Sequence, residues 1–295
     1  MEQVRERLIH IHRCRGVSRR TIQKFLQDDP SLQTVYRLTP AQVSQLYRLP
    51  MKYASQFCHD LHQDHLRTKL LEDLSHYQII TIVDESYPVM LKRIKDPPLV
   101  LYLKGNQSLL HHIPALSIIG TRNPSTEALK KTALFVKPLV KNNWVIVSGM
   151  AQGVDRFAHL LSLQYGGKTI AVLGSGFKHI YPKQNRSLFY HIAKKGLLIS
   201  EYPPDQPALR HHFPERNRII SGLSMGTLVI EATERSGTLI TVDQALDQGR
   251  EVYAVPGSPL IPQTKGCHQL IQDGAKLAMN ATDILEDWEG IQIHS

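Results

Sequence analysis

The sequence has few cysteines and no long apolar run. Its three cysteines, Cys14, Cys58 and Cys267, are odd in number and widely spaced, which argues against a disulfide framework and favours a reducing compartment. No apolar run reaches the roughly 18 residues that a membrane-spanning helix needs. Residues 1–20 carry too many charges for a secretory signal peptide. These absences predict a cytoplasmic protein without a membrane contact.

The motifs of several common enzyme classes are also missing. There is no G-x-x-x-x-G-K-[ST] segment, which excludes a P-loop. Gly174-Ser175-Gly176 begins like a dinucleotide fingerprint, but His179 stands at the third glycine position, which disfavours NAD. Gly222-Leu223-Ser224-Met225-Gly226 matches G-x-S-x-G, yet the expected strand and helix around it are in the wrong order for a nucleophile elbow. We therefore expect no catalytic triad, cofactor or metal.

Basic residues outnumber acidic ones. The chain has 35 Lys and Arg against 26 Asp and Glu, and its net charge is +9. Both the first 72 residues and the remainder share this excess. Such an excess is typical of proteins with a polyanionic partner, but it also occurs in proteins that bind nothing anionic. Charge alone therefore suggests a nucleic-acid partner but does not establish one.

Residues 1–72 have the pattern of a small helical domain. Apolar runs on either side of Gly16 indicate two helices, and Thr39-Pro40-Ala41-Gln42 has the form of a capping box that opens another. Four or five short helices are expected, in an all-α unit like the SAM and helix-hairpin-helix modules that grip the DNA backbone. A zinc site is not expected, because the candidate ligands lack paired spacing. They are His10, His12, Cys14, Cys58 and His59.

From residue 73 to 295 the pattern is that of a second, α/β domain. Two strands, at residues 79–83 and 99–103, precede a series in which strands alternate with helices. The alternation predicts right-handed βαβ units and a doubly wound, mostly parallel sheet. The strands of the series are expected at residues 116–119, 145–147, 170–173, 197–199, 228–230 and 252–255, and helices at 125–141, up to 163 and at 185–195.

Small residues follow five of the predicted strands, at the edge where open α/β sheets place their ligands. Small residues let backbone amides converge on an anion, so we expect these turns to bind phosphates. Arg122 and Arg216 would supply full positive charge at the same rim. The turns are Gly120-Thr121-Arg122, Ser148-Gly149, Gly174-Ser175-Gly176, Ser236-Gly237-Thr238 and Pro256-Gly257.

A helix expected from Phe213 to Gly222 carries an unusually placed arginine. Pro214 suits its first turn and Glu215 its positive end. At about 100° per residue, Arg216 falls on the apolar stripe that should face the sheet, whereas Arg218 points the opposite way. An arginine there either lines an anion-binding crevice or reaches a structural carboxylate. The crevice is our hypothesis.

Several segments of the α/β domain form an ordered series of motifs: residues 117–122, 147–155, 169–176, 213–224, 231–232 with 236–241, and 249–257. In order and spacing they resemble the DprA/Smf DNA-processing family, from about residue 87 to residue 288. The resemblance implies an extended Rossmann-like domain that binds single-stranded DNA and forms homodimers. It further implies that the protein protects incoming DNA and loads RecA recombinase onto it during natural transformation, without turnover of a substrate.

The family's DNA-contacting positions carry over to a defined set of residues here. A DNA strand would lay its phosphates across the turns and arginines, while Phe213 stacks on a base. Thr121 and Ser236-Gly237-Thr238 join the expected site from the small-residue turns. The carried-over positions are Arg122, Gly174, Ser175, Gly176, Lys183 or Arg186, Phe213, Arg216, Asn217 and Arg218.

The chain departs from the family pattern at two places. Gln152 replaces a usually basic residue, and Gly266-Cys267-His268 stands where the family commonly reads Gly-Thr-Asn. The winged-helix domain of longer members is not recognisable after Trp288, so duplex binding is not expected.

Two other functions remain open from the sequence. One is a nucleoside-monophosphate phosphoribohydrolase that uses Arg216, Glu231 and Gly237-Thr238, although the Pro-Gly-Gly-x-Gly-Thr signature is incomplete. The other is a regulator that senses a nucleotide without catalysis. Glu231 could pair with Glu234 in acid–base chemistry, or it could receive Arg216 or Arg235 as a structural partner.

Overall fold

A computed structural model of the protein describes residues 2–289. The chain divides into two compact units, an N-terminal unit of Met1–Tyr87 with Pro97–Tyr102 and a sheet unit of Pro88–Asp96 with Leu103–Ser295. Within the described range, no helix has both the length and the apolar character that crossing a membrane requires. The domain boundary between residues 72 and 73 stays a prediction.

The N-terminal unit is helical, as its sequence predicts. The capping box is present: the Thr39 hydroxyl accepts from the Gln42 amide, and the Gln42 side chain accepts from the Thr39 amide. Phe25 centres the core, with the Tyr47 ring edge-on at 4.4 Å and the Phe57 ring stacked at 5.4 Å. The elements are α1 (Glu2–Arg13), α2 (Arg19–Asp28), the 3₁₀ helix η1 (Thr34–Arg37), α3 (Pro40–Tyr47), α4 (Met51–Leu61), α5 (Asp64–His76) and β1 (Gln78–Thr81). They are followed along the chain by α6 (Val89–Lys92), β2 (Val100–Gly105) and η2 (Gln107–His111).

The sheet unit contains a parallel sheet with the strand order β6-β5-β4-β3-β7-β8-β9. Leu116 on β3 pairs with Ile146 on one side and with Gly226 on the other. Strands β3 to β7 are buried along their whole length, which is why they read as unbroken apolar runs. The strands are β3 (Ala115–Ile119), β4 (Val145–Ser148), β5 (Thr169–Leu173), β6 (Leu197–Ser200), β7 (Gly226–Val229), β8 (Glu251–Ala254) and β9 (Lys276–Leu277).

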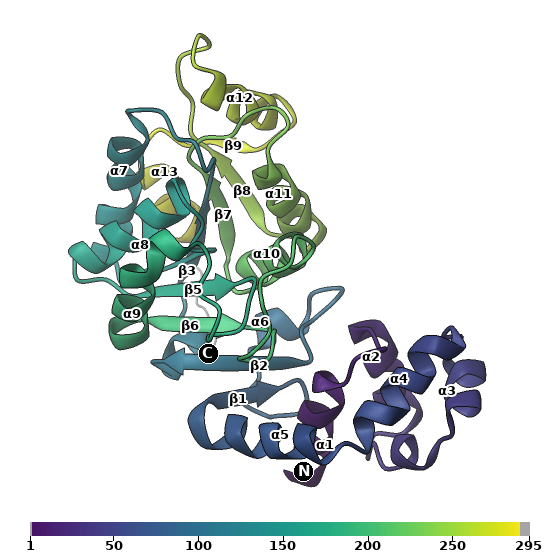
Figure 1. Ribbon diagram of the computed structural model, residues 1–295. Helices are drawn as coiled ribbons and strands as arrows, with labels where there is room; N and C mark the ends of the chain where they lie inside the picture. Colours follow the sequence, from purple (N-terminus) through teal and green to yellow (C-terminus); the bar gives the residue numbers. More distant parts are fainter. Residues whose placement is uncertain (1, 290–295) are drawn as a thin grey trace. The chain divides into compact units, whose positions relative to one another are not determined.

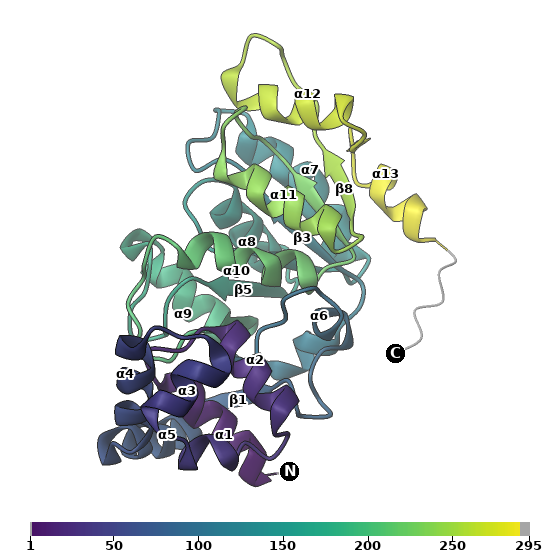
Figure 2. The ribbon, with the colours of Figure 1, turned by 90° about the vertical axis from the view of Figure 1, so that its right-hand side faces the viewer.

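Helices cover both faces of this sheet. Two views of the ribbon show α7, α8 and α9 on one face and α10 and α11 on the other (Figures 1 and 2). Phe135 and Val136 of α7 and Val154 and Ala158 of α8 are buried in one hydrophobic cluster with strand residues such as Ile118. The helices are α7 (Ala128–Lys141), α8 (Val154–Gln164), η3 (Lys183–Asn185), α9 (Arg186–Lys195), α10 (His212–Gly222), α11 (Gly237–Asp247), η4 (Pro262–Thr264), α12 (Lys265–Gln272), α13 (Thr282–Leu285) and η5 (Glu286–Trp288).

The winding of the sheet reverses between β3 and β7. The chain leaves β3 through α7 toward β4, but it leaves β7 through α11 toward β8, on the other side. The carboxyl ends of β3 and β7 therefore flank a topological switch point, where open α/β sheets bind ligands. The predicted fold class, a doubly wound and mostly parallel sheet after a helical region, is confirmed.

Candidate nucleic-acid interface

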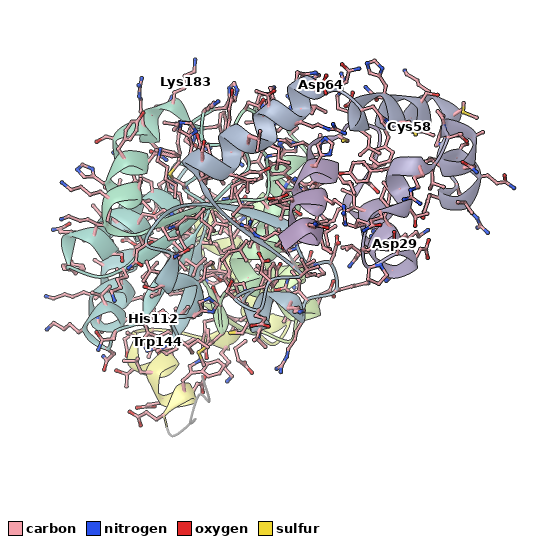
Figure 3. The ribbon with its side chains drawn as sticks, turned by 90° about the horizontal axis from the view of Figure 1, so that it is seen from below. Asp29, Cys58, Asp64, His112, Trp144 and Lys183 are labelled. Atoms are coloured by element: carbon pink, nitrogen blue, oxygen red, sulfur yellow. The ribbon has the colours of Figure 1, made fainter. Side chains whose placement is uncertain are left out.

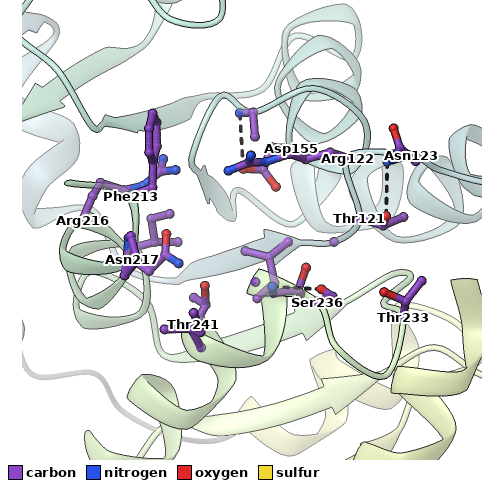
Figure 4. Close-up of a pocket in the computed structure, with 18 of the residues that line it drawn as sticks. Thr121, Arg122, Asn123, Asp155, Phe213, Arg216, Asn217, Thr233, Ser236 and Thr241 are labelled. Atoms are coloured by element: carbon purple, nitrogen blue, oxygen red, sulfur yellow. Dashed lines mark hydrogen bonds between the residues drawn. The ribbon is translucent and has the colours of Figure 1, made fainter. Parts of the chain in front are cut away.

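A pocket of about 580 Å³ opens at this switch point (Figure 4). Most of its lining comes from the loop after β3, from α10, and from the segment that joins β7 to α11 together with the start of α11. Side chains of all three parts surround the opening in the close-up. The predicted site residues that line the pocket are Thr121, Arg122, Phe213, Arg216, Asn217, Ser236, Gly237 and Thr238.

Arg216 is the buried cation of the pocket. Its side chain is 4% exposed, and Nη1 donates to the carbonyl oxygens of Gly149 and Val172, beyond β4 and within β5. Nε has no hydrogen-bond partner among the described residues. Burial lowers the pKa of Arg216 to about 10, against the opposing charge of Asp155, so the side chain is cationic at neutral pH. The arginine lies on the sheet side of α10, as its helical position predicts.

Gly149 makes room for this guanidinium. A Cβ atom at this position would overlap the guanidinium of Arg216. The Gly149 amide does not face a ligand, because it donates to Oδ2 of Asp155 at 3.2 Å. The missing side chain, and not the amide, is therefore what this glycine contributes to the pocket.

Asp155 is the counter-charge to Arg216, and it was not among the predicted site residues. Its carboxylate is nearly buried in the first turn of α8 and also accepts from the Ala151 amide at 3.4 Å. Burial raises the pKa of its carboxyl, while the Arg216 charge and the two amides oppose that rise. The sequence feature that could identify Asp155 as a site residue is its position, because an acidic residue suits the positive end of a helix that follows a strand-end turn.

Four of the five small-residue turns use an amide within the protein, so fewer amides are left for a phosphate than the sequence suggests. The positive charge of the pocket therefore comes mainly from side chains. Besides Gly149, the internal donors are Thr121 to the Glu231 carbonyl (2.8 Å), Gly176 to the Gln206 carbonyl (2.8 Å) and Thr238 to Ser236 Oγ (2.9 Å).

The Gly174-Ser175-Gly176 turn packs behind Phe213 and does not belong to the described lining of the pocket. A Cβ at Gly174 would come within 3.0 Å of the Phe213 ring. Ser175 is buried, and its hydroxyl donates to the His179 carbonyl at 2.7 Å. The turn thus supports Phe213, and its contact with DNA stays a prediction.

Phe213 stands between an aromatic ring and a cation. The Tyr181 ring lies 5.2 Å away, and the guanidinium carbon of Arg122 lies 5.7 Å from the Phe213 ring centroid, within cation–π range. Tyr181 and Arg210 also line the pocket, although neither was predicted. No sequence signal marks them, because they reach the pocket through the irregular segments after β5 and β6.

Lys183 and Arg186 do not belong to the described lining. Lys183 is exposed on η3 and points outward at the edge of the molecule in Figure 3. Arg186 opens α9, with its guanidinium carbon 5.9 Å from the Tyr190 ring centroid. Their contact with DNA stays a prediction.

Arg218 is engaged elsewhere in the sheet unit. Its Nη2 lies 2.8 Å from both carboxylate oxygens of Glu201, and both side chains are nearly buried. Nε donates to the Asp96 carbonyl at 2.8 Å and Nη1 to the Glu215 carbonyl at 2.6 Å. Arg218 does not belong to the described pocket lining, and its predicted contact with DNA has no support from this geometry.

Glu231 has a structural partner, but this partner is neither of the two arginines that the sequence offers, Arg216 and Arg235. It is fully buried and accepts from Nζ of Lys131 at 3.0 Å and from the amide and hydroxyl of Ser125 at 2.8 Å and 2.5 Å. The loop after β3 folds back onto the end of β7 to make these contacts. This also explains why α7 begins at Ala128, later than the predicted residue 125.

Within the described part of the chain, no three His, Cys, Asp or Glu side chains are grouped to hold a metal ion. The three cysteines are free and buried there.

Comparison with known proteins identifies the family. The family model of DNA recombination-mediator protein A matches residues 78–289. The DNA processing protein DprA of Bacillus subtilis is 48% identical over 208 residues, which are 70% of each chain. This chain belongs to the DprA/Smf family.

Solved structures of DprA/Smf proteins resemble the chain over most of its length. DprA from Streptococcus pneumoniae superimposes with a TM-score of 0.85 and 36% identity, covering 96% of this chain and 97% of that one. DNA processing protein A from Helicobacter pylori, whose structure is described for its single-stranded DNA binding mode, gives a TM-score of 0.65 and 31% identity. That match covers 72% of this chain and 96% of the other.

The two departures from the DprA/Smf pattern lie outside the described lining of the pocket. Gln152 is exposed after β4. Cys267 is buried in α12 with Sγ near the Val229 carbonyl, and His268 places Nε2 3.0 Å from the Gly257 carbonyl oxygen. Both residues of α12 therefore pack against strand ends.

Proposed function

We propose that this protein binds single-stranded DNA in the pocket at the switch point. The observation that carries the proposal is Arg216, a buried cation that lines the pocket together with the exposed Arg122. Phosphates neutralise such charges, and the Phe213 ring offers a stacking surface that does not read sequence. A crevice of this size admits one backbone, whereas a duplex is too wide. The binding mode named for the Helicobacter pylori relative supports the same function.

Membership of the DprA/Smf family supports a wider role for this binding. The protein acts in the cytoplasm as a homodimer that protects incoming DNA during natural transformation and loads RecA recombinase onto it. It binds DNA without turnover. The relatives that carry the name DNA processing protein DprA support this role.

A phosphoribohydrolase fits the geometry less well. That reaction would use Glu231 as its carboxylate, but Glu231 is fully buried and already accepts hydrogen bonds from Ser125 and Lys131. It does not belong to the described lining of the pocket.

Fluorescence anisotropy with labelled oligo-dT of several lengths, set against the matching duplex over a salt series, tests the proposal. We expect affinity that grows with length, prefers the single strand and falls with a log–log salt slope of about −0.7 per phosphate neutralised. Arg122→Ala should weaken binding similarly for all sequences and flatten that slope. Lys168→Ala is the control, because Lys168 is exposed before β5, at the opposite edge of the sheet. Weak, length-independent binding would contradict the proposal, and release of base from a mononucleotide would point to the enzyme instead.

A further inference from the structure

The loop that carries Arg122 has no regular structure of its own. Residues 120–127 lie between β3 and α7, outside any helix or strand, yet Thr121, Arg122 and Asn123 all line the pocket. A loop of this kind would lose conformational freedom whenever it closed on a ligand, and affinity would fall by that cost. A contact that holds the loop in its binding conformation before a ligand arrives would reduce that cost.

One residue holds the loop at both ends. The Glu231 backbone carbonyl accepts from the Thr121 amide at 2.8 Å, at the start of the loop. Its carboxylate accepts from the Ser125 amide through Oε2 at 2.8 Å, and from the Ser125 hydroxyl through Oε1 at 2.5 Å, near the end. Arg122 therefore lies between two anchor points on the same glutamate.

The negative charge of Glu231 is balanced by a cation that does not belong to the described pocket lining. Lys131 of α7 lies with Nζ 3.0 Å from Oε1, and its side chain is itself only 13% exposed. Hydrogen bonds to a buried charged acceptor are about twice as strong as neutral ones, so the carboxylate is suited to fix a loop. Replacing it by an amide would turn one acceptor atom into a donor, which would face either the Ser125 amide or the Lys131 ammonium.

We propose that Glu231 is a positioning residue for DNA binding, which presents Arg122 to the ligand without touching it. This inference rests on the proposed function of the pocket. It assigns the buried Lys131–Glu231–Ser125 network to pre-organisation of the binding loop. The network ties β7, α7 and the loop after β3 together, so the cation on the loop stands at a fixed place beside the switch point.

A DNA-free measurement tests the anchoring. Trypsin cleavage after Arg122 should be several-fold faster in Glu231→Gln than in the wild type, because the loop opens more often. Glu201→Gln is the matched control: Glu201 is also a nearly buried carboxylate paired with a cation, but that cation, Arg218, lies on α10 and not on the loop after β3. Unchanged cleavage in Glu231→Gln would overturn the proposal. If that variant does not fold, Ser125→Ala, which removes one of the three donors, takes its place with the same expected direction.

A double-mutant cycle tests the route to DNA. Glu231→Gln should weaken oligo-dT binding roughly tenfold, the order of effect of one lost charged hydrogen bond. Combined with Arg122→Ala it should add nothing, because it acts through Arg122. Full additivity, or unchanged affinity in Glu231→Gln while Arg122→Ala binds weakly, would overturn the inference. If Arg122→Ala and Arg216→Gln both bind like the wild type, the pocket itself is not the DNA site and the proposed function fails.

Discussion

Two arginines on α10, two residues apart, are both buried and are used in opposite ways. Arg218 faces away from the pocket, and each nitrogen of its guanidinium has an acceptor in Glu201, Asp96 or Glu215. Arg216 lines the pocket and keeps its Nε without a partner among the described residues. Burial alone therefore does not decide whether a cation is structural. The supply of acceptors around it does.

The two environments differ in charge as well as in hydrogen bonds. Glu201 meets Arg218 directly, with both carboxylate oxygens on Nη2, so the pair is neutral. Asp155 acts on Arg216 through its field, while its oxygen accepts from the amides of Gly149 and Ala151. Positive potential therefore remains at Arg216 for a phosphate, and little remains at Arg218.

The largest expected effect is on folding. Arg218→Ala should lower the free energy of unfolding by about 3–5 kcal/mol, because it removes the cation that meets both carboxylate oxygens of the nearly buried Glu201. Urea denaturation measures the loss, and Lys168→Ala, a change at an exposed lysine, should stay within about 0.5 kcal/mol of the wild type. A stable Arg218→Ala variant with poor DNA affinity would contradict the structural role of Arg218, since Arg218 would then be a DNA contact.

Arg216→Gln should act on binding instead. We expect single-stranded DNA affinity to fall about tenfold to a hundredfold, or roughly 1.4–2.8 kcal/mol, because a cation in the pocket is lost. The log–log salt slope should become shallower by about 0.7, the contribution of one phosphate. Anisotropy titrations over a salt series measure both quantities, with Lys168→Gln as the control. Weaker binding with an unchanged salt slope would mean that Arg216 positions the pocket without meeting a phosphate.

The sequence predicts the orientation of the two arginines on α10, but not the residues with which they pair. The apolar strand runs and the helical period place Arg216 toward the sheet and Arg218 away from it, because both depend on local spacing. Glu201 could not be chosen as the partner of Arg218, since the two lie on different elements, at the end of β6 and in α10, and meet only through tertiary packing.

The same limit applies around the rest of the pocket. The pairing of Glu231 with Lys131, 100 positions earlier, depends on the path of one loop. The turn at Gly176 is at the predicted sheet edge, but its amide is taken by the Gln206 carbonyl. The sequence pattern predicts where the strands end, whereas the acceptor that each backbone amide meets there depends on long-range packing.

The smallest effect is on the pH dependence of stability, and it tests whether water is excluded from the region behind Arg216. His159 of α8 is fully buried, with Nδ1 2.7 Å from the Thr169 hydroxyl. Burial, together with the smaller effect of the Arg216 charge, lowers the pKa of its imidazole to about 3. In the unfolded chain the same imidazole titrates near 6.5. Between these values only the unfolded state takes up the proton, so stability is complete above pH 6.5 and falls as the pH decreases.

Between pH 7.5 and pH 5.5 the wild type should therefore lose about 1 kcal/mol more unfolding free energy than His159→Gln, which has no imidazole to titrate. Denaturation curves at the two pH values measure the difference, and comparing each protein with itself removes the cost of the substitution. Equal losses would mean that His159 takes up its proton in the folded state as readily as in the unfolded one. Water would then reach the back of the pocket, and the environment of Arg216 would not be desolvated as described.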